Sequence, residues 1–346
     1  MSWSNKIENF WYLSSPRAWF VYLLWPFNLI FLAIVQAKRF LYYLGLLKKQ
    51  SFNKPVIVVG NISVGGTGKT PFIHQYVKLL EENDIRVGLV SRGYKAKIKD
   101  FPHQVKESDQ AVDVGDEAYL QFSSLNIPFV IDPNRSRAVK YLVDSNNVDL
   151  VISDDGLQHY KMDRQAEIVL FDGSRGLGNQ LILPLGPLRE PKQRLKSVNL
   201  VIENKSEIDS GTESESTSEH DATVRLSNVC FKQLTTNEIF ALESFKGQKI
   251  HGVAAIGNPE HFFNSLDKLC KIESRRTYAD HYLFKEVDFE KYNSEIVIMT
   301  EKDASKCFPF AKENWYYLQV EMVFDNDLQI RLLDLAKTLI KNHPSV

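Results

Sequence analysis

The chain has 346 residues, of which 44% are hydrophobic and 25% charged, so it can bury cores in about two domains. Its formal net charge of -1 and the lack of a basic stripe argue against nucleic acid as a partner, because phosphate-backbone binders concentrate positive charge. The three cysteines, Cys230, Cys270 and Cys307, are far apart and odd in number. They suggest neither a disulfide framework nor a zinc site, and they fit a reducing cytosol.

The N-terminal segment, 1–50, contains a charge-free apolar run with the sequence AWFVYLLWPFNLIFLAIV. The run just reaches the length of a bilayer span, but Pro26 breaks the helical hydrogen-bond ladder and Asn28 is costly in lipid. We therefore favour a kinked, half-inserted helix pair at a membrane surface, with the nearby aromatic and basic side chains at the headgroups. A true transmembrane span and an ordinary core helix stay open as alternatives.

A glycine-rich turn follows at PVIVVGNISVGGTGKT, the start of a segment, 51–222, that we assign to a P-loop domain. The pattern G-x-x-x-x-G-K-[ST] expects glycine where Ser63 stands, but a strand before the turn and an amphipathic helix after it supply the required context. Lys69 can reach the β and γ phosphates of a nucleotide, and Thr70 can bind Mg²⁺. The predicted phosphate-binding residues are Ser63, Val64, Gly65, Gly66, Thr67, Gly68, Lys69 and Thr70.

Short apolar runs then alternate with helical patterns, which predicts β-α-β units and a mostly parallel sheet of the P-loop NTPase type. The expected strands are 56–59, 87–91, 129–132, 150–155, 168–172 and 200–204. Open α/β sheets bind ligands at the C-terminal ends of their strands. Ser91, Asp132, Asp154 and Asp172 are therefore expected near the nucleotide.

Acidic residues supply the next candidates. In VISDDGLQH, 151–159, either Asp154 or Asp155 suits the Walker B position that holds Mg²⁺, although the pair could also form a plain turn. Asp116 is a candidate general base, or with Glu117 a helix cap. His281 has an acid beside it, but a lone histidine can equally be structural. The loop LPLGPLREP, 183–191, leaves the roles of Arg189 and Glu190 ambiguous.

The later segments indicate a second, smaller α/β lobe, 223–325, and a C-terminal helix, 326–346. Strands are expected at 250–256, 296–300 and 316–324, with helices at 259–269 and 328–340. The helix at 328–340 could pack on either lobe. Residues 203–222 are rich in Ser, Glu and Thr, which predicts a flexible acidic loop or linker between the lobes.

The order of GNISVGGTGKTP, SRGY, GDE, DDGLQH, LPLGPLREP, GNPEHFF, DHY and TEKDA resembles the tetraacyldisaccharide 4'-kinase family over nearly the whole chain. The resemblance implies transfer of the γ-phosphoryl group of ATP to the 4'-hydroxyl of tetraacyldisaccharide 1-phosphate, which yields lipid IVA in lipid A biosynthesis. It also implies a P-loop kinase at the cytoplasmic face of the bacterial inner membrane. No obligate protein partner is indicated.

The same resemblance implies residue roles. Lys69 would stabilise the phosphates, Thr70 and the pair Asp154 and Asp155 would serve Mg²⁺, and Asp116 would act as base with His281 as its partner. Because His281 belongs to the second lobe, the pair implies lobe closure. Possible further polar contacts are Arg92, Glu117, Gln158 and Arg189.

Other functions stay open on the residues alone. A membrane-tethered switch NTPase would hydrolyse nucleotide with water as acceptor, although Val64 replaces the additional lysine of partitioning-type ATPases. The run Asn204-Lys205-Ser206-Glu207 is similar to the N-K-x-D guanine motif, but Glu207 replaces its aspartate. A transporter interface at the N-terminus is a third alternative, against which the absence of further long apolar segments argues.

Overall fold

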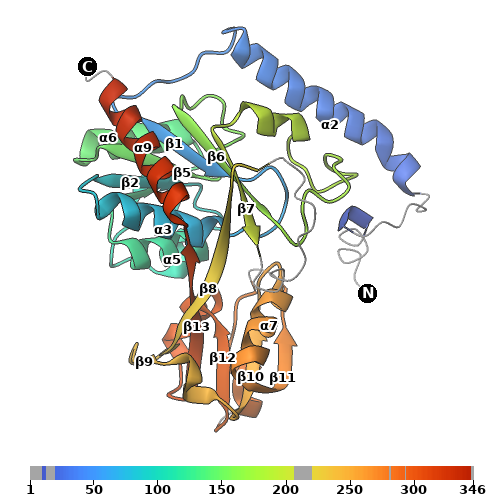
Figure 1. Ribbon diagram of the computed structural model, residues 1–346, viewed down its shortest axis with the longest axis vertical. Helices are drawn as coiled ribbons and strands as arrows, with labels where there is room; N and C mark the ends of the chain where they lie inside the picture. The colour runs from blue at the N-terminus through green and yellow to red at the C-terminus, as the bar shows by residue number, and fades with distance from the viewer. Residues whose placement is uncertain (1–9, 13–19, 206–219, 280–281, 293, 344–346) are drawn as a thin grey trace.

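The computed structural model describes residues 10–12, 20–205, 220–279, 282–292 and 294–343, and the described strands form one continuous 13-stranded sheet. Figure 1 shows this sheet passing from an upper lobe, where the terminal helices lie, to a smaller lower lobe. The predicted α/β class, with a mostly parallel sheet, is confirmed. The boundaries proposed for the domains stay a prediction, because the two lobes share their sheet.

In the first lobe the strand order is β7-β6-β1-β5-β2-β4-β3, and neighbouring strands are parallel except β3 and β4. Central strands buried on both faces need apolar side chains at every position, which explains their near-continuous Val, Ile and Leu runs. The strands are β1 Val56–Gly60, β2 Val87–Ser91, β3 His103–Gln104, β4 Phe129–Ile131, β5 Leu150–Asp154, β6 Ala166–Asp172 and β7 Leu200–Lys205. The six strands predicted for this lobe are confirmed within two residues at each end.

Helices cover both faces of this half of the sheet. The helices are α3 Lys69–Glu81, α4 Ala111–Val114, α5 Asp116–Leu125, α6 Arg135–Ser145 and α9 Asn326–Asn342. On one face α3 buries Phe72 and Tyr76 beside Leu332 of α9, and the Tyr76 hydroxyl donates to the Leu332 carbonyl at 3.1 Å. On the other face α6 buries Val139 and Leu142. The C-terminal helix therefore packs on the first lobe.

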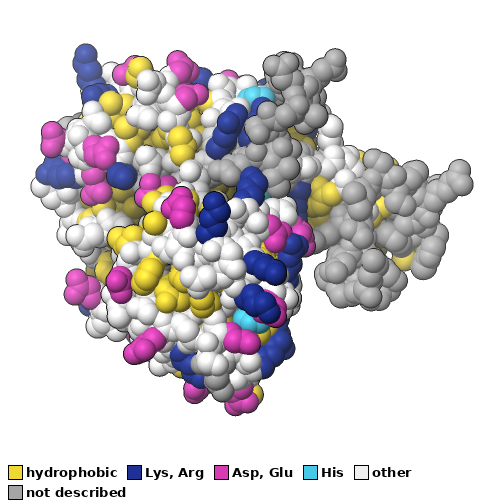
Figure 2. Space-filling view, turned by 60° about the horizontal axis from the view of Figure 1, so that its bottom comes forward, with side chains coloured by type: hydrophobic (Ala, Val, Ile, Leu, Met, Phe, Trp, Pro, Cys, Tyr) yellow, Lys and Arg dark blue, Asp and Glu magenta, His cyan; other side chains and the backbone are white. Residues whose placement is uncertain are grey.

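The second lobe continues the sheet through two long strands. β8, Ala222–Gln233, pairs in parallel with β7 at its start and antiparallel with β13, Trp315–Val323, along the rest. The parallel strands β12 Ile296–Thr300, β10 Lys249–Ala254 and β11 Lys271–Thr277 follow, and β9 Ile239–Phe240 pairs with β8. Helices α7 Pro259–Leu269 and α8 Glu301–Cys307 pack on these strands. The end of this lobe, forward in Figure 2, carries basic and acidic side chains interspersed.

Four strands and part of the linker differ from prediction. The two-residue strands β3 and β9 were not expected, because they are too short to show an apolar pattern. β8 and β11 were not expected either, because β11 alternates exposed and half-buried side chains at the sheet edge and β8 is only partly covered. The predicted linker at 203–222 is wrong at its two ends, because β7 extends to Lys205 and β8 begins at Ala222. Hydrogen bonds to neighbouring strands outweigh the polar composition there. Residues 206–219 lie outside the described residues.

The apolar N-terminal run forms one helix, α2 Phe20–Tyr43, which continues through Pro26. The expected helix pair is therefore wrong for this segment. Asn28 is buried because it faces the protein, where its amide donates to the Ile182 carbonyl at 2.5 Å. By length and composition the stretch Leu23–Tyr43 could cross a membrane, and 6% of its most apolar window is buried in the protein. The helix thus presents a long apolar surface outward.

Candidate active site

The phosphate loop lies at the C-terminal end of β1, between β5 and β6, and it runs into α3 at Lys69. Gly65 has a φ of +116° and Gly68 a φ of +85°, backbone conformations that residues other than glycine rarely adopt. A Cβ atom at Gly68 would also lie 2.5 Å from the Asn204 amide nitrogen. Backbone N–H groups can therefore approach a phosphate closely at the positive end of α3.

Neighbouring segments support the loop from outside. The Val64 N–H donates to the Pro187 carbonyl at 2.8 Å, and the Arg189 N–H donates to the Ile62 carbonyl at 2.6 Å. Ser63 is buried and forms a bridge with Leu188. Serine replaces the usual glycine here without strain, since positive φ in the loop occurs at Gly65 and Gly68. The loop LPLGPLREP thus stabilises the phosphate loop through backbone hydrogen bonds.

Asp154 ends β5 and Asp155 follows it, and the two side chains occupy different electrostatic surroundings. The Asp154 Oδ2 atom accepts from the Gln121 amide at 2.7 Å, whereas its Oδ1 atom is buried without a hydrogen-bond partner. Burial raises the pKa of Asp154 to about 6, although the Lys69 charge opposes the shift. Burial acts in the same sense on Asp155, but Lys69 and Arg189 outweigh it and hold the pKa of Asp155 below its usual range. The Lys69 charge therefore acts on both carboxylates.

Arg189 binds Asp155 directly. Its Nη1 atom donates to the two carboxylate oxygens of Asp155 at 3.1 and 2.9 Å. A second arginine, Arg135, is buried behind the pair and donates to the Asp154 carbonyl at 3.1 Å. Burial lowers the pKa of Arg135 to about 10. The two guanidinium groups thus lie where their positive charge offsets the negative charge of the two adjacent carboxylates.

Asp116 lies at the first turn of α5, facing the second lobe. Gly115 before it has a φ of +93°, and a Cβ atom there would collide with the Tyr94 carbonyl. The Asp116 carboxylate is 3.8 Å from the Lys306 ammonium, and the Glu117 carboxylate accepts from Lys302 at 3.0 Å. Both lysines belong to α8. The start of α5 is thus the point where charged groups of the two lobes meet.

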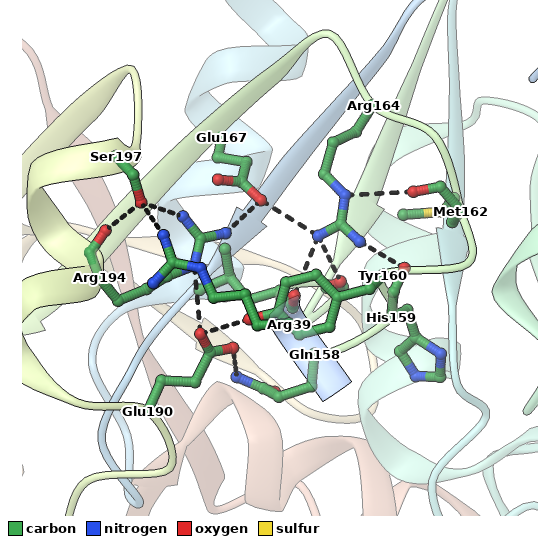
Figure 3. A network of polar contacts seen from close by, with 12 residues as sticks. Arg39, Gln158, His159, Tyr160, Met162, Arg164, Glu167, Glu190, Arg194 and Ser197 are labelled. Atoms are coloured by element: carbon green, nitrogen blue, oxygen red, sulfur yellow. Dashed lines mark hydrogen bonds and ion pairs between the residues drawn. The ribbon is translucent and has the colours of Figure 1, made fainter. Parts of the chain in front are cut away.

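The remaining predicted residues separate into three cases. Arg92 is exposed directly after β2, and its charge reaches Arg135. His281 lies outside the described residues. Figure 3 shows Gln158 directed toward Glu190, which accepts from the Gln158 amide at 3.1 Å, so Gln158 belongs to a polar network beside the metal-binding candidates. The network also includes Tyr160, Glu167 and Arg194.

Several residues of the site were not predicted from the sequence. Gln121, Arg135 and Lys306 each contact a predicted residue or its backbone from a distant part of the chain. The motif TEKDA, which contains Lys302, contributed to the family resemblance, but the sequence predicted no role for its residues. The spacing of Lys302 and Lys306 by one helical turn is the signal that could have indicated a shared face.

The fold and the phosphate loop define a P-loop nucleotide-binding enzyme. The family model described as tetraacyldisaccharide-1-P 4'-kinase matches residues 20–337. A tetraacyldisaccharide 4'-kinase of Legionella pneumophila (strain Corby) is 42% identical over 315 residues, covering 91% of this chain and 92% of the relative. One of Haemophilus influenzae (strain 86-028NP) is 42% identical over 314 residues, covering 90% of each.

A solved structure is similar as well. The crystal structure of LpxK from Aquifex aeolicus, in complex with ATP, has a TM-score of 0.75 and 27% identity, and the match covers 92% of this chain and 99% of that one. The chain belongs to the tetraacyldisaccharide 4'-kinase family. It is therefore a kinase of lipid A biosynthesis, and the predicted resemblance is confirmed.

Proposed function

We propose that the protein uses the site around Lys69 to transfer the γ-phosphoryl group of ATP to the 4'-hydroxyl of tetraacyldisaccharide 1-phosphate, forming lipid IVA. The observation that carries this proposal is the meeting of the phosphate loop and the acidic pair at one edge of the sheet, where the Lys69 charge acts on both Asp154 and Asp155. The loop residues 63–70 bind the phosphates through backbone N–H groups other than that of Val64, which is donated to Pro187, and Lys69 neutralises charge on the transferred group.

Thr70, Asp154 and Asp155 are the residues that would hold Mg²⁺. The donor set fits the ion, since hard oxygen ligands suit Mg²⁺ and the phosphates and water complete its shell. Asp154 is the better direct ligand, because its buried Oδ1 atom lacks a partner while both oxygens of Asp155 accept from Arg189. When bound, the ion would supply positive charge that offsets the negative charge of the transferred phosphoryl group.

Asp116 acts as the general base. A carboxylate is ionised at neutral pH and can accept the proton of the sugar hydroxyl as the new P–O bond forms. Two contacts support this role: Gln121 of the same helix donates to Asp154, and Asp116 lies 3.8 Å from Lys306 of the second lobe. We assign His281 as the partner of this base.

An Asp116→Asn variant is expected to lower kcat by about 10²- to 10⁴-fold, because the amide cannot take the proton, while ATP binding is retained. The measurement follows labelled phosphate from ATP into the tetraacylated lipid with detergent-purified protein and Mg²⁺. His281→Ala should likewise lower kcat while nucleotide binding survives.

The matched control is Asp144→Asn, which makes the same chemical change in an exposed surface pair with Lys140. It should keep wild-type kcat. Equal transfer by Asp116→Asn and wild type would leave the kinase activity intact and remove Asp116 as base. ATP turnover without labelled lipid would instead indicate a switch NTPase.

The membrane surface is the second proposed partner, and α2 lies along it at the cytoplasmic face of the inner membrane. Asn28 contacts the protein near one end of α2, and Arg39 donates to the Ser197 hydroxyl at 3.0 Å near the other. These contacts are separated by about 16 Å of helix. A spanning orientation would expose Asn28 to lipid without its carbonyl partner, so the contacts favour a helix lying on the bilayer.

Replacing Phe27, Ile30 and Ile34 of α2 with serine should reduce co-sedimentation with phosphatidylglycerol vesicles at least about tenfold, because each change removes exposed apolar area. The matched control changes Ile239, Val287 and Ile330 to serine, since these side chains are similarly exposed but lie outside α2. Unchanged sedimentation of the α2 variant would contradict the membrane-lying role.

A further inference from the structure

Lys306 is a buried lysine in the second lobe whose side chain is 2% exposed. Burying an ammonium group is unfavourable unless its charge is compensated, so its surroundings should hold acidic partners. Two carboxylates provide this compensation. Asp303, one turn earlier on α8, accepts from the Lys306 ammonium at 3.0 Å, and Asp116 of the first lobe lies 3.8 Å from it.

Asp303 is itself fixed by the core of the second lobe. Its side chain is completely buried, and its Oδ2 atom accepts from the Ala255 N–H at 2.8 Å and from the Thr300 hydroxyl at 2.7 Å. The other oxygen therefore points to Lys306 in a defined direction. The Lys306 ammonium also lies 5.7 Å from the centre of the Phe284 ring. Contacts within the second lobe thus fix the position of the lysine independently of Asp116.

We propose that Lys306 is a positioning residue, which orients the Asp116 carboxylate from the second lobe. The orientation of the base would then depend on how α8 packs against α5. This inference rests on the proposed role of Asp116. Asp303 would need one positive charge for its own compensation, and Lys306 supplies it. An ion pair that served only to neutralise Asp303 would not require Lys306 to lie beside a second carboxylate. Lys306 nevertheless lies 3.8 Å from Asp116 of the other lobe.

The adjacent ion pair strengthens the same junction. Lys302, one turn before Lys306 on α8, donates to Glu117, the residue after Asp116 on α5. Two successive acids at the start of α5 therefore face two lysines on one side of α8. Two such contacts restrict the rotation of α5 relative to α8 as well as the distance between the two helices. This matters because a misplacement of about 1 Å at a reacting group can lower a rate by about 10²-fold.

The test begins with Lys306→Met, which removes the charge at similar side-chain length. We expect kcat for lipid phosphorylation to fall about 10- to 100-fold with the KM for ATP changed less than about twofold, because the phosphate loop is left intact. Lys249→Met is the matched control, since it breaks an exposed pair with Glu273 in the same lobe. The control should keep wild-type kcat.

A second variant separates positioning from folding. Lys306→Met alone leaves Asp303 buried without its cation and can destabilise the lobe. The double variant Lys306→Met with Asp303→Asn removes both charges but keeps an acceptor oxygen for Ala255 and Thr300. We expect it to regain the wild-type melting temperature and to keep the low kcat. Recovery of kcat to within about twofold of wild type would show that Lys306 only neutralises Asp303, and would overturn the proposal.

The third comparison places Lys306→Met in the Asp116→Asn background. If Lys306 acts through Asp116, it should lower the remaining kcat by less than about twofold, because coupled residues are not additive. A further fall by the factor seen in wild type would overturn the proposal. If Asp116→Asn alone keeps wild-type kcat, the base assignment itself fails, and that result appears without any Lys306 variant.

Discussion

Replacing Lys69 with methionine is expected to lower kcat about 10³-fold or more, because the variant loses the ammonium group at the first position of α3 that neutralises the transferred phosphoryl group. The same change removes the charge that opposes the raised pKa of Asp154 and lowers that of Asp155. ATP binding should weaken as well. Phosphate transfer to lipid and calorimetric binding of ATP, each at several Mg²⁺ concentrations, would measure the two effects.

Lys78→Met is the matched control for this prediction. Lys78 lies on the same helix, is exposed near its C-terminal end, and should not affect transfer. Lys69→Arg should restore only part of the activity, because a planar guanidinium cannot replace a compact ammonium within a closely fitting loop. A Lys69→Met enzyme with kcat near wild type would exclude phosphate stabilisation by this residue.

The strands of the first lobe could be predicted because buried parallel strands need apolar side chains at every position. Residues 87–91 and 150–154 are buried, and their apolar composition alone predicts strands. β11 could not be predicted this way, since its sequence KIESRRT is stabilised by backbone pairing with β10 and by few apolar contacts. The neighbouring helix α7 could be predicted around 259–269, because its apolar side chains follow a helical period.

The residues of the candidate site also differ in whether a local sequence pattern could predict them. The phosphate loop and the acidic pair are local motifs, so spacing alone indicates them. Their partners come from elsewhere: Gln121 lies 33 residues from Asp154, and the pair between Lys302 and Glu117 joins residues 185 apart. Such contacts depend on how the strands are ordered and how the lobes meet, which no local pattern encodes. Asn28 is a similar case, because its carbonyl partner is 154 residues away.

The two adjacent aspartates are expected to respond differently to the same substitution. Asp154→Asn should lower kcat about 10²- to 10³-fold and raise the Mg²⁺ concentration needed for half-maximal activity, since it neutralises the oxygen that lacks a partner. Asp155→Asn should have the smaller effect on Mg²⁺ dependence, because both Asp155 oxygens accept from Arg189. Mg²⁺ titration of transfer activity at saturating ATP would measure both.

The pair of variants is well matched at the backbone. Asp155 has a φ of +50°, and asparagine adopts this left-handed conformation readily, so Asp155→Asn changes charge without adding strain. The side-chain amide in Asp154→Asn would still offer an acceptor oxygen to Gln121, so the fold around α5 should survive in that variant. A larger rise in Mg²⁺ requirement for Asp155→Asn than for Asp154→Asn would assign the direct metal contact to Asp155 and leave Asp154 as the group that orients it.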